Sequence, residues 1–136
     1  MDERLLEAFR STEYLVCIDP AHWACLHVDQ PLPQPLQLLV GARAWGFVTA
    51  WNPQAQPRAP ERNLAAQREL LASLAAFQDV VILPAVGVGT NGWYEPSLFV
   101  IGIEPAALDP LAHRYRQCGY LCGRGPGVAQ LRLLRA

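Results

Sequence analysis

Apolar residues recur along the chain with two different spacings, which separate helical segments from strands. Residues 61–78, ERNLAAQRELLASLAAFQ, have the clearest helical pattern in the sequence. Pro60 precedes them and suits the first turn of a helix, where its missing N–H is not needed. The apolar face of this helix comprises Leu64, Leu70, Leu71, Leu74, Ala75 and Phe77. Asn63 lies close to the same face, so its amide is expected to point toward the core.

Two shorter helices are predicted in the first third of the chain. The first carries an apolar stripe of Leu5, Leu6 and Phe9, and the second follows a proline-rich segment and ends near Gly41. The segment DQPLPQP (29–35) has prolines at alternate positions, which favours an extended surface loop leading into that helix. A weak docking peptide for a protein partner is the second interpretation of this segment.

The last helix is predicted to begin at Asp109, whose side chain suits an N-cap, with Pro110 in the first helical position. Its apolar stripe comprises Leu108, Leu111, Ala112 and Tyr115. Gly119 is expected to end it, because glycine tolerates the left-handed conformation found after many helices. Gln117 would then lie near the end of this helix, on its inward side.

Segments rich in β-branched and aromatic residues are predicted to be strands. They are EYLVCI (13–18), HWACLHV (22–28), AWGFVTAW (44–51), DVVILPAVGVG (79–89), WYEPSLFVIGI (93–103), YLCG (120–123) and VAQLRLLRA (128–136). The first two are joined by a short turn, and the fourth and fifth by Thr90-Asn91-Gly92, so both pairs are expected to be antiparallel.

Residues 44–51 are apolar on both faces, which is typical of a central strand covered by helices, and Asn52 and Pro53 end it. The sequence shows no internal repeat and no domain boundary. It therefore predicts a single α/β (α+β) domain over residues 1–136, with one mixed, mostly antiparallel sheet packed against three to four helices.

Charge excludes several classes of partner. The eleven basic side chains are all arginine, nearly balance twelve acidic ones and are scattered from Arg4 to Arg135, so no nucleic-acid partner is expected. The absence of lysine removes Schiff-base chemistry. No apolar stretch approaches the ~20 residues that a bilayer crossing requires, and MDERLLEAFR does not resemble a signal peptide. These features predict a cytoplasmic protein without a membrane partner.

Cys17, Cys25, Cys118 and Cys122 form two loose pairs in the sequence. A metal site would recruit His22 and His27, but spacings of eight and four differ from the common two-residue zinc knuckle. Free packing thiols, without a metal or another cofactor, are therefore the prediction.

GVGTNG (87–92) has the spacing of a dinucleotide-binding fingerprint and follows a predicted strand. That fingerprint requires a helix next, because the helix N-terminus holds the pyrophosphate. Here WYEPSLFVIGI follows, which is predicted to be a strand, while Asn91-Gly92 favours a hairpin turn. The nucleotide-binding interpretation is rejected.

Polar residues next to apolar surfaces are the candidate site. They are Asn52, Asn63, Trp93, Glu95, Ser97 and Gln117. Side chains at alternate positions of a strand share one face, so Trp93, Glu95 and Ser97 are expected to point together toward Asn52 at the end of the central strand. Arg10 or Arg62 is the predicted charged partner of Glu95.

The chain resembles the bacterial family known as domain of unknown function 3293. The resemblance rests on FRSTEY (9–14), TAWNP (49–53), Asn63, WYEPS (93–97) and Gln117. Ala55 and Cys118 depart from the family pattern, which often has serine and alanine there. Because the family is uncharacterised, the resemblance implies no activity.

Three functions remain open from the sequence. The polar set is interpreted as a pocket for a small polar ligand, with the nearby arginines available for an anionic group. Alternatively, it is a buried structural network in a protein-interaction module, with VAQLRLLRA as the edge of a homodimer. The third hypothesis is a hydrolase-like enzyme in which Glu95 is the general base.

Overall fold

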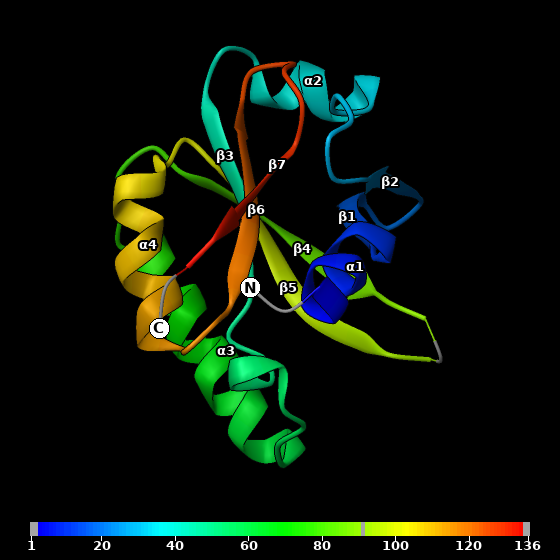
Figure 1. Cartoon of the computed structure of the whole chain (residues 1–136). Coiled ribbons are helices and arrows are strands. Elements are labelled where there is room, and N and C mark those ends of the chain that lie inside the picture. Colours follow the sequence, from blue (N-terminus) through cyan, green and yellow to red (C-terminus); the bar gives the residue numbers. More distant parts are fainter. Residues whose placement is uncertain (1–2, 91, 135–136) are drawn as a thin grey trace.

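The computed structural model describes residues 3–90 and 92–134, which form one curled sheet with helices packed on its faces (Figure 1). The strands are β1 (Glu13–Asp19), β2 (His22–Leu26), β3 (Ala44–Val48), β4 (Val81–Val88), β5 (Tyr94–Ile101), β6 (Gly119–Arg124) and β7 (Gln130–Leu133). The helices are α1 (Glu3–Ser11), α2 (Gln34–Val40), α3 (Pro60–Ala75) and α4 (Pro105–Arg114), with a single 3-10 turn at Pro53–Ala55. This is the predicted α+β class.

The order of strands in the sheet is β2-β1-β4-β5-β3-β6-β7. Every pair of neighbouring strands in this sheet is antiparallel. The sequence predicted a mixed, mostly antiparallel sheet, but no parallel pair is present among the described strands. The predicted β1–β2 and β4–β5 hairpins are present. β3 is an interior strand between β5 and β6, while β5 occupies the middle of the order.

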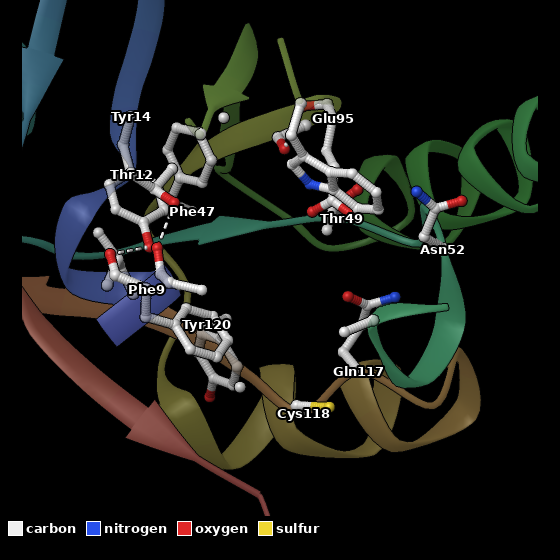
Figure 2. Close-up of a pocket in the computed structure, with 18 of the residues that line it drawn as sticks. Phe9, Thr12, Tyr14, Phe47, Thr49, Asn52, Glu95, Gln117, Cys118 and Tyr120 are labelled. Atoms are coloured by element: carbon white, nitrogen blue, oxygen red, sulfur yellow. Dashed lines mark hydrogen bonds between the residues drawn. The ribbon is translucent and has the colours of Figure 1, made fainter. Parts of the chain in front are cut away.

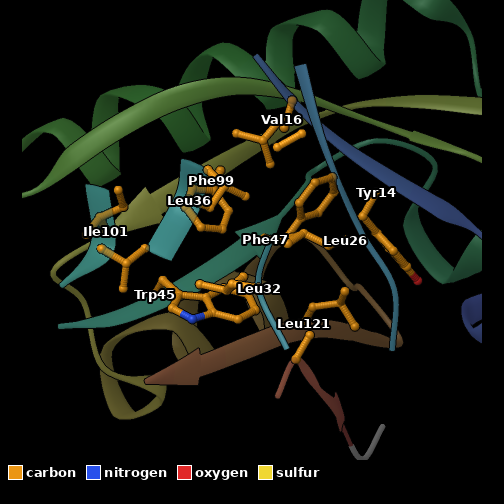
Figure 3. Close-up of a cluster of buried hydrophobic side chains, with 14 residues drawn as sticks. Tyr14, Val16, Leu26, Leu32, Leu36, Trp45, Phe47, Phe99, Ile101 and Leu121 are labelled. Carbon is orange, nitrogen blue, oxygen red and sulfur yellow. The ribbon is translucent and has the colours of Figure 1, made fainter. Parts of the chain in front are cut away.

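The two faces of the sheet carry separate hydrophobic cores. The first, shown in Figure 3, lies against α2 and includes Tyr14, Val16, Leu26, Leu36, Trp45, Phe47, Phe99 and Leu121. The second lies against α3 and α4 and includes Val48, Leu70, Leu74, Val100 and Leu108. Phe47 points to the first core and its neighbour Val48 to the second. All five residues of β3 are therefore buried, as a strand covered on both faces requires.

Two prolines lie within strands at positions that do not break the sheet. Pro84 of β4 falls outside the part of that strand that pairs with β1, which is Ala85–Val88. Pro96 of β5 falls outside the part that pairs with β3, which starts at Leu98. Each proline therefore belongs to a stretch with a strand on one side only, where its missing N–H leaves no ladder bond unmade.

The start and end of α4 differ from the prediction. The helix begins at Pro105, after Glu104, and Pro110 lies inside it. Glu104-Pro105 is an earlier pair of the same kind as Asp109-Pro110, an acidic residue followed by a proline suited to the first helical position, and the helix starts at the earlier pair. Asp109 is instead an acceptor for the Tyr120 hydroxyl, with Oδ1 at 2.6 Å.

α4 also ends before the predicted Gly119, which is the first residue of β6. Arg116, rather than a glycine, adopts the positive φ of 55° after the helix. Gln117 consequently lies in the connection to β6 and not on the helix. This short connection brings Gln117 beside the segment that follows β3.

The proline-rich segment is packed against the rest of the chain. Leu32 is buried, and Pro31 forms a bridge with Val128 next to the last hairpin. α2 starts at Gln34, within the predicted loop. These contacts favour the loop interpretation over a free docking peptide.

The ends of the last two hairpins are only partly described. GVGTNG lies at the end of the β4–β5 hairpin, but Asn91 of the predicted turn lies outside the described residues. Arg135 and Ala136 of the predicted last strand do so too. β7 pairs with β6 alone in the described sheet, and homodimerisation through it stays a prediction. Within the described parts of the chain, none of the helices has the length and apolar character needed to span a bilayer.

Candidate functional site

A cavity of about 330 Å³ lies between α1, the start of β1, one end of β3 and β5, and the connection from α4 to β6. Figure 2 shows Phe9, Tyr14 and Phe47 on one side of it and Asn52 and Gln117 on the other. Its apolar lining includes Leu5, Phe9, Tyr14, Phe47, Trp93 and Leu121. Its polar lining includes Thr49, Asn52, Glu95, Ser97 and Gln117. No basic side chain belongs to the described lining.

The structure brings together five of the eight candidate residues that the sequence suggested. They are Asn52, Trp93, Glu95, Ser97 and Gln117. Trp93, Glu95 and Ser97 share one side of their strand, as alternation predicts. Asn63, Arg10 and Arg62 do not line the cavity. Asn63 lies directly behind it, whereas Arg10 lines a separate surface depression with Leu6 and Asp29, and Arg62 is exposed on α3.

Asn63 is bonded through both atoms of its side-chain amide. Its Oδ1 accepts the Asn52 backbone N–H at 2.9 Å and the Arg58 Nε at 3.0 Å. Its Nδ2 donates to Asn52 Oδ1 at 2.7 Å and to the Arg58 carbonyl at 3.3 Å. The side chain is 1% exposed. With every hydrogen-bonding position used inside the protein, Asn63 holds the chain after β3 in place.

Asn52 presents its amide nitrogen to the cavity. Its Oδ1 accepts from Asn63 Nδ2 and from the Arg58 backbone N–H, at 2.7 and 3.2 Å. These two donors determine which end of the amide is oxygen, and Nδ2 is left on the cavity side, as Figure 2 shows. Asn52 therefore offers the cavity a hydrogen-bond donor.

Gln117 offers the opposite group. Its Nε2 donates to the Trp51 carbonyl at 3.1 Å and to the Tyr115 carbonyl at 3.2 Å. The oxygen is therefore turned toward the cavity, as Figure 2 shows, and is an acceptor there. The bond to Trp51 also ties the connection before β6 to the segment after β3.

That segment holds an unusual backbone conformation. Asn52, Gln54 and Ala55 have positive φ values of 46°, 59° and 58°. Asparagine tolerates this region, but alanine and glutamine seldom adopt it. The Gln54 N–H donates to the Arg116 carbonyl at 2.8 Å, which adds to the bonds from Asn63 and Gln117. Several independent bonds thus hold a strained turn that contributes Asn52 and Ala55 to the cavity lining, a pattern frequent at functional sites.

Thr49, Asn52, Glu95, Ser97 and Gln117 form the polar wall of the cavity, and Glu95 is the ionisable group among them. Burial raises the pKa of its carboxyl from 4.5 to about 7, and the Asn52 side chain opposes this shift through hydrogen bonding. None of the ion pairs between described residues includes Glu95. The predicted partnership with Arg10 or Arg62 is therefore wrong, because neither arginine reaches the cavity.

The arginine of this region is Arg58, which the sequence did not single out. Its guanidinium bonds the Asn63 side chain, and Nη2 reaches the carbonyls of Ala50 and Arg62 at 3.5 and 3.3 Å. Arg58 therefore stabilises the amide network around Asn63 and does not form an ion pair with Glu95.

Gln67 is a second residue that sequence reasoning missed. Its Oε1 accepts the Ala50 N–H at 2.8 Å, while Thr49 Oγ1 donates to the Pro96 carbonyl at 2.7 Å and so links the end of β3 to β5. The buried Nε2 of Gln67 has no hydrogen-bond partner. Gln67 lies four residues after Asn63, on the same helix face, and that spacing was the signal for a second inward amide.

The lining of the cavity includes two further ionisable groups, Tyr14 and Cys118. The Tyr14 hydroxyl donates to the Phe9 carbonyl at 2.8 Å, and burial together with the charge of Glu95 raises its pKa. The pKa of the Cys118 thiol is raised for the same two reasons. Both are therefore protonated at neutral pH. Phe9 and Tyr14 were predicted to belong to the first helix and the first strand, but neither was predicted to line the site.

The four cysteines are free thiols. Only Cys122 is buried, whereas Cys17, Cys25 and Cys118 are half-buried. The prediction of unbridged thiols is confirmed, but three of them are more accessible than packing residues usually are.

Comparison with known proteins connects this cavity to one family. Residues 48–119 match the family described as "Protein of unknown function (DUF3293)". The matched range extends from the end of β3 to the start of β6 and thus contains the polar wall of the cavity. No curated protein and no solved structure matches the chain.

Proposed function

Because the chain belongs to the DUF3293 family of proteins of unknown function, which supplies no activity, we propose from the cavity itself that the protein binds a small polar molecule. The ligand is neutral or positively charged. The observation that carries this proposal is Glu95, a half-buried carboxyl in a cavity whose described lining contains no cation. Moving a carboxyl out of water without a cation costs free energy even where an amide such as Asn52 donates to it, and a ligand that supplies positive charge or further donors recovers part of that cost.

The other polar groups complement this carboxyl. Asn52 supplies a donor and Gln117 an acceptor, while Trp93 and Phe47 provide aromatic surface. A few oriented polar groups in an otherwise apolar cavity are typical of small-molecule sites. The volume of about 330 Å³ suits a metabolite rather than a polymer. An anionic ligand is disfavoured because the described lining contains a carboxyl and no basic group.

The test is thermal unfolding of the wild type and Glu95→Gln across a library of amines, amides and nitrogen heterocycles, with anionic metabolites as a control set. Each compound is screened at about pH 5.5 and about pH 8.5, on either side of the pKa near 7. A cationic ligand should raise the midpoint more at the higher pH, where Glu95 is ionised, and Glu95→Gln should lose most of the shift.

The proposal fails if the compounds that stabilise the wild type also stabilise Glu95→Gln to the same extent, or if only anions stabilise it. Arg62→Gln is the matched control, because this exposed side chain lies outside the cavity. It should retain the wild-type response.

A second candidate is proton-transfer catalysis by Glu95. A carboxyl with a pKa of about 7 exchanges protons readily at neutral pH, which is the property required of a general acid or base. Cys118 is not the nucleophile in this scheme, since burial and Glu95 raise its pKa. Once a ligand is known, its turnover by the wild type and loss of turnover with retained binding in Glu95→Gln would support a hydrolase-like enzyme. Binding without conversion would restrict the function to recognition.

A further inference from the structure

A second group of side chains with ligand-forming atoms lies on the β1–β2 hairpin. It comprises Glu13, Cys25 and His27. In the antiparallel register, Tyr14 lies opposite Leu26 and Leu15 opposite Cys25, so Glu13 faces position 27. Residues 13, 25 and 27 thus share one face of the hairpin. The alternate residues Tyr14 and Leu26 point to the opposite face, into the first hydrophobic core.

The three side chains converge on a small volume. Cys25 Sγ lies 3.9 Å from Glu13 Oε2 and 3.9 Å from His27 Nε2. One ligand atom from each residue lies within 4.8 Å of the other two. In a tetrahedral zinc site, Zn–S bonds of about 2.3 Å and Zn–N or Zn–O bonds of about 2.0 Å separate the ligand atoms by about 3.3–3.6 Å. The observed spacing approaches this arrangement.

We propose that Glu13, Cys25 and His27 form a binding site for Zn²⁺. Thiolate, imidazole and carboxylate are the three ligand types that zinc takes in proteins, and three protein ligands leave a fourth position for water or another molecule. Glu13 is exposed and its side chain can close the remaining gap by a change of rotamer. Cys25 and His27 are half-buried and lie two residues apart, so their side chains are on the same face of the chain, which pre-positions them.

This site is independent of the cavity around Glu95, because its ligands lie on the other face of β1 from Tyr14. Linear spacing does not reveal it. Cys25 lies on β2 and His27 directly after its last residue, while the third ligand, Glu13, comes from β1 through the sheet register. The zinc knuckles considered from the sequence depend on two cysteines close in sequence, a pattern absent at this hairpin.

Two neighbouring residues provide matched controls. His22 bonds Asp19 through Nδ1 at 2.8 Å, and Cys17 bonds the Asp19 carbonyl at 3.4 Å. Both belong to the same hairpin and are partly or fully exposed, yet neither is part of the group of three. Cys17 and His22 therefore offer a thiol and an imidazole outside the proposed site.

The experiment titrates the reduced full chain with Zn²⁺ by calorimetry and with Co²⁺ by absorption spectroscopy. One equivalent of metal should bind, and Co²⁺ should give tetrahedral bands with a thiolate charge-transfer band. Cys25→Ser should abolish that band, and His27→Ala and Glu13→Gln should weaken binding of both metals. Cys17→Ser and His22→Ala should bind like the wild type. Unfolding of each variant without metal checks that it is folded.

A second readout follows the thiol itself. Bound Zn²⁺ should protect Cys25 from alkylation in a mass-spectrometric assay, while Cys17 remains reactive. The proposal is overturned if the chain binds no metal, or if binding persists in Cys25→Ser and His27→Ala. It is equally overturned if Cys118→Ser abolishes metal binding, since the thiol in use would then be the one in the cavity.

Discussion

Two polar regions at the cavity differ in how their hydrogen-bonding groups are used. Behind the cavity, on the side of α3, Asn63 uses both ends of its amide within the protein, and Arg58 adds a third residue to this network. In the cavity lining, on the side of β5, Glu95 is half-buried, and no described cation pairs with it. The Asn63 network has the polar composition of a binding site, but its hydrogen bonds are all made within the protein. The Glu95 carboxyl is available to a ligand.

Polar composition alone therefore does not locate a site. A satisfied network stabilises and orients the backbone, whereas a carboxyl that is partly removed from water without a cation carries a free-energy cost that a ligand can relieve. Asn52 belongs to both regions, because its oxygen completes the network and its nitrogen faces the cavity. The comparison assigns Asn63 a structural role and Glu95 a binding role.

The largest effect is expected from Asn63→Ala. The change removes the acceptor of the buried Asn52 N–H and of the half-buried Arg58 Nε, which should cost about 3–4 kcal/mol of unfolding free energy. Denaturant unfolding measures this loss. Arg62→Ala, at an exposed position of the same helix, is the control and should stay within about 0.5 kcal/mol of the wild type. A loss below about 1 kcal/mol would show that the network does not hold the turn, and the contrast with Glu95 would disappear.

Glu95→Gln should change the dependence of stability on pH. The folded state raises the pKa from 4.5 to about 7, so the wild type is favoured at low pH and loses that stabilisation as the pH rises from about 4.5 through about 7. At about 1.4 kcal/mol for each pH unit, the loss is at most about 3 kcal/mol. Glu95→Gln has no such ionisation and should gain on the wild type as the pH rises.

Unfolding of both proteins at several pH values between about 4 and about 8.5 measures this difference. Exposed Glu61→Gln on α3 is the control and should follow the wild type. If stability changes with pH in the same way for the wild type and Glu95→Gln, folding does not shift the pKa of Glu95. The cavity would then not contain a carboxyl that lacks a cation.

The smallest effect is expected from Asn52→Gly, which separates the two roles of this residue. Glycine accepts the φ of 46° without strain, but the two bonds that Asn52 Oδ1 accepts are lost. Asn63 Nδ2 keeps the Arg58 carbonyl as an acceptor and Arg58 is only half-buried, so the cost should be about 2 kcal/mol. Because Asn52 lowers the pKa of Glu95, that pKa should rise further in the variant. An unchanged pH profile with the same loss of stability would show that Asn52 belongs to the network alone.

Local signals in the sequence predicted much of the fold. Turn residues indicated the β1–β2 and β4–β5 hairpins, and the helical period of residues 61–78 placed Asn63 on an inward face. Local signals could not decide between two competing starts of the last helix. Glu104-Pro105 and Asp109-Pro110 both resemble helix starts, and only the packing of the whole chain selects the first.

The candidate site was predictable where it depends on alternation along one strand, as for Trp93, Glu95 and Ser97. It was not predictable where it depends on the order of strands. That order places α1 and FRSTEY across the cavity from β5, and it keeps Arg10 away from Glu95. Arg58 was missed because it lies in an irregular segment, where periodicity gives no direction for a side chain.

The most direct measurement is the titration of the Glu95 carboxyl by NMR, using carbon-13-labelled protein and Glu95→Gln to identify the signal. We predict a midpoint near pH 7, well above the ordinary value of 4.5, because removal from water disfavours the ionised carboxyl and no described cation offsets this. A midpoint at or below 4.5 would contradict this prediction. Glu95 would then be solvated or paired with a cation, and the distinction between the Asn63 network and the Glu95 carboxyl would no longer hold.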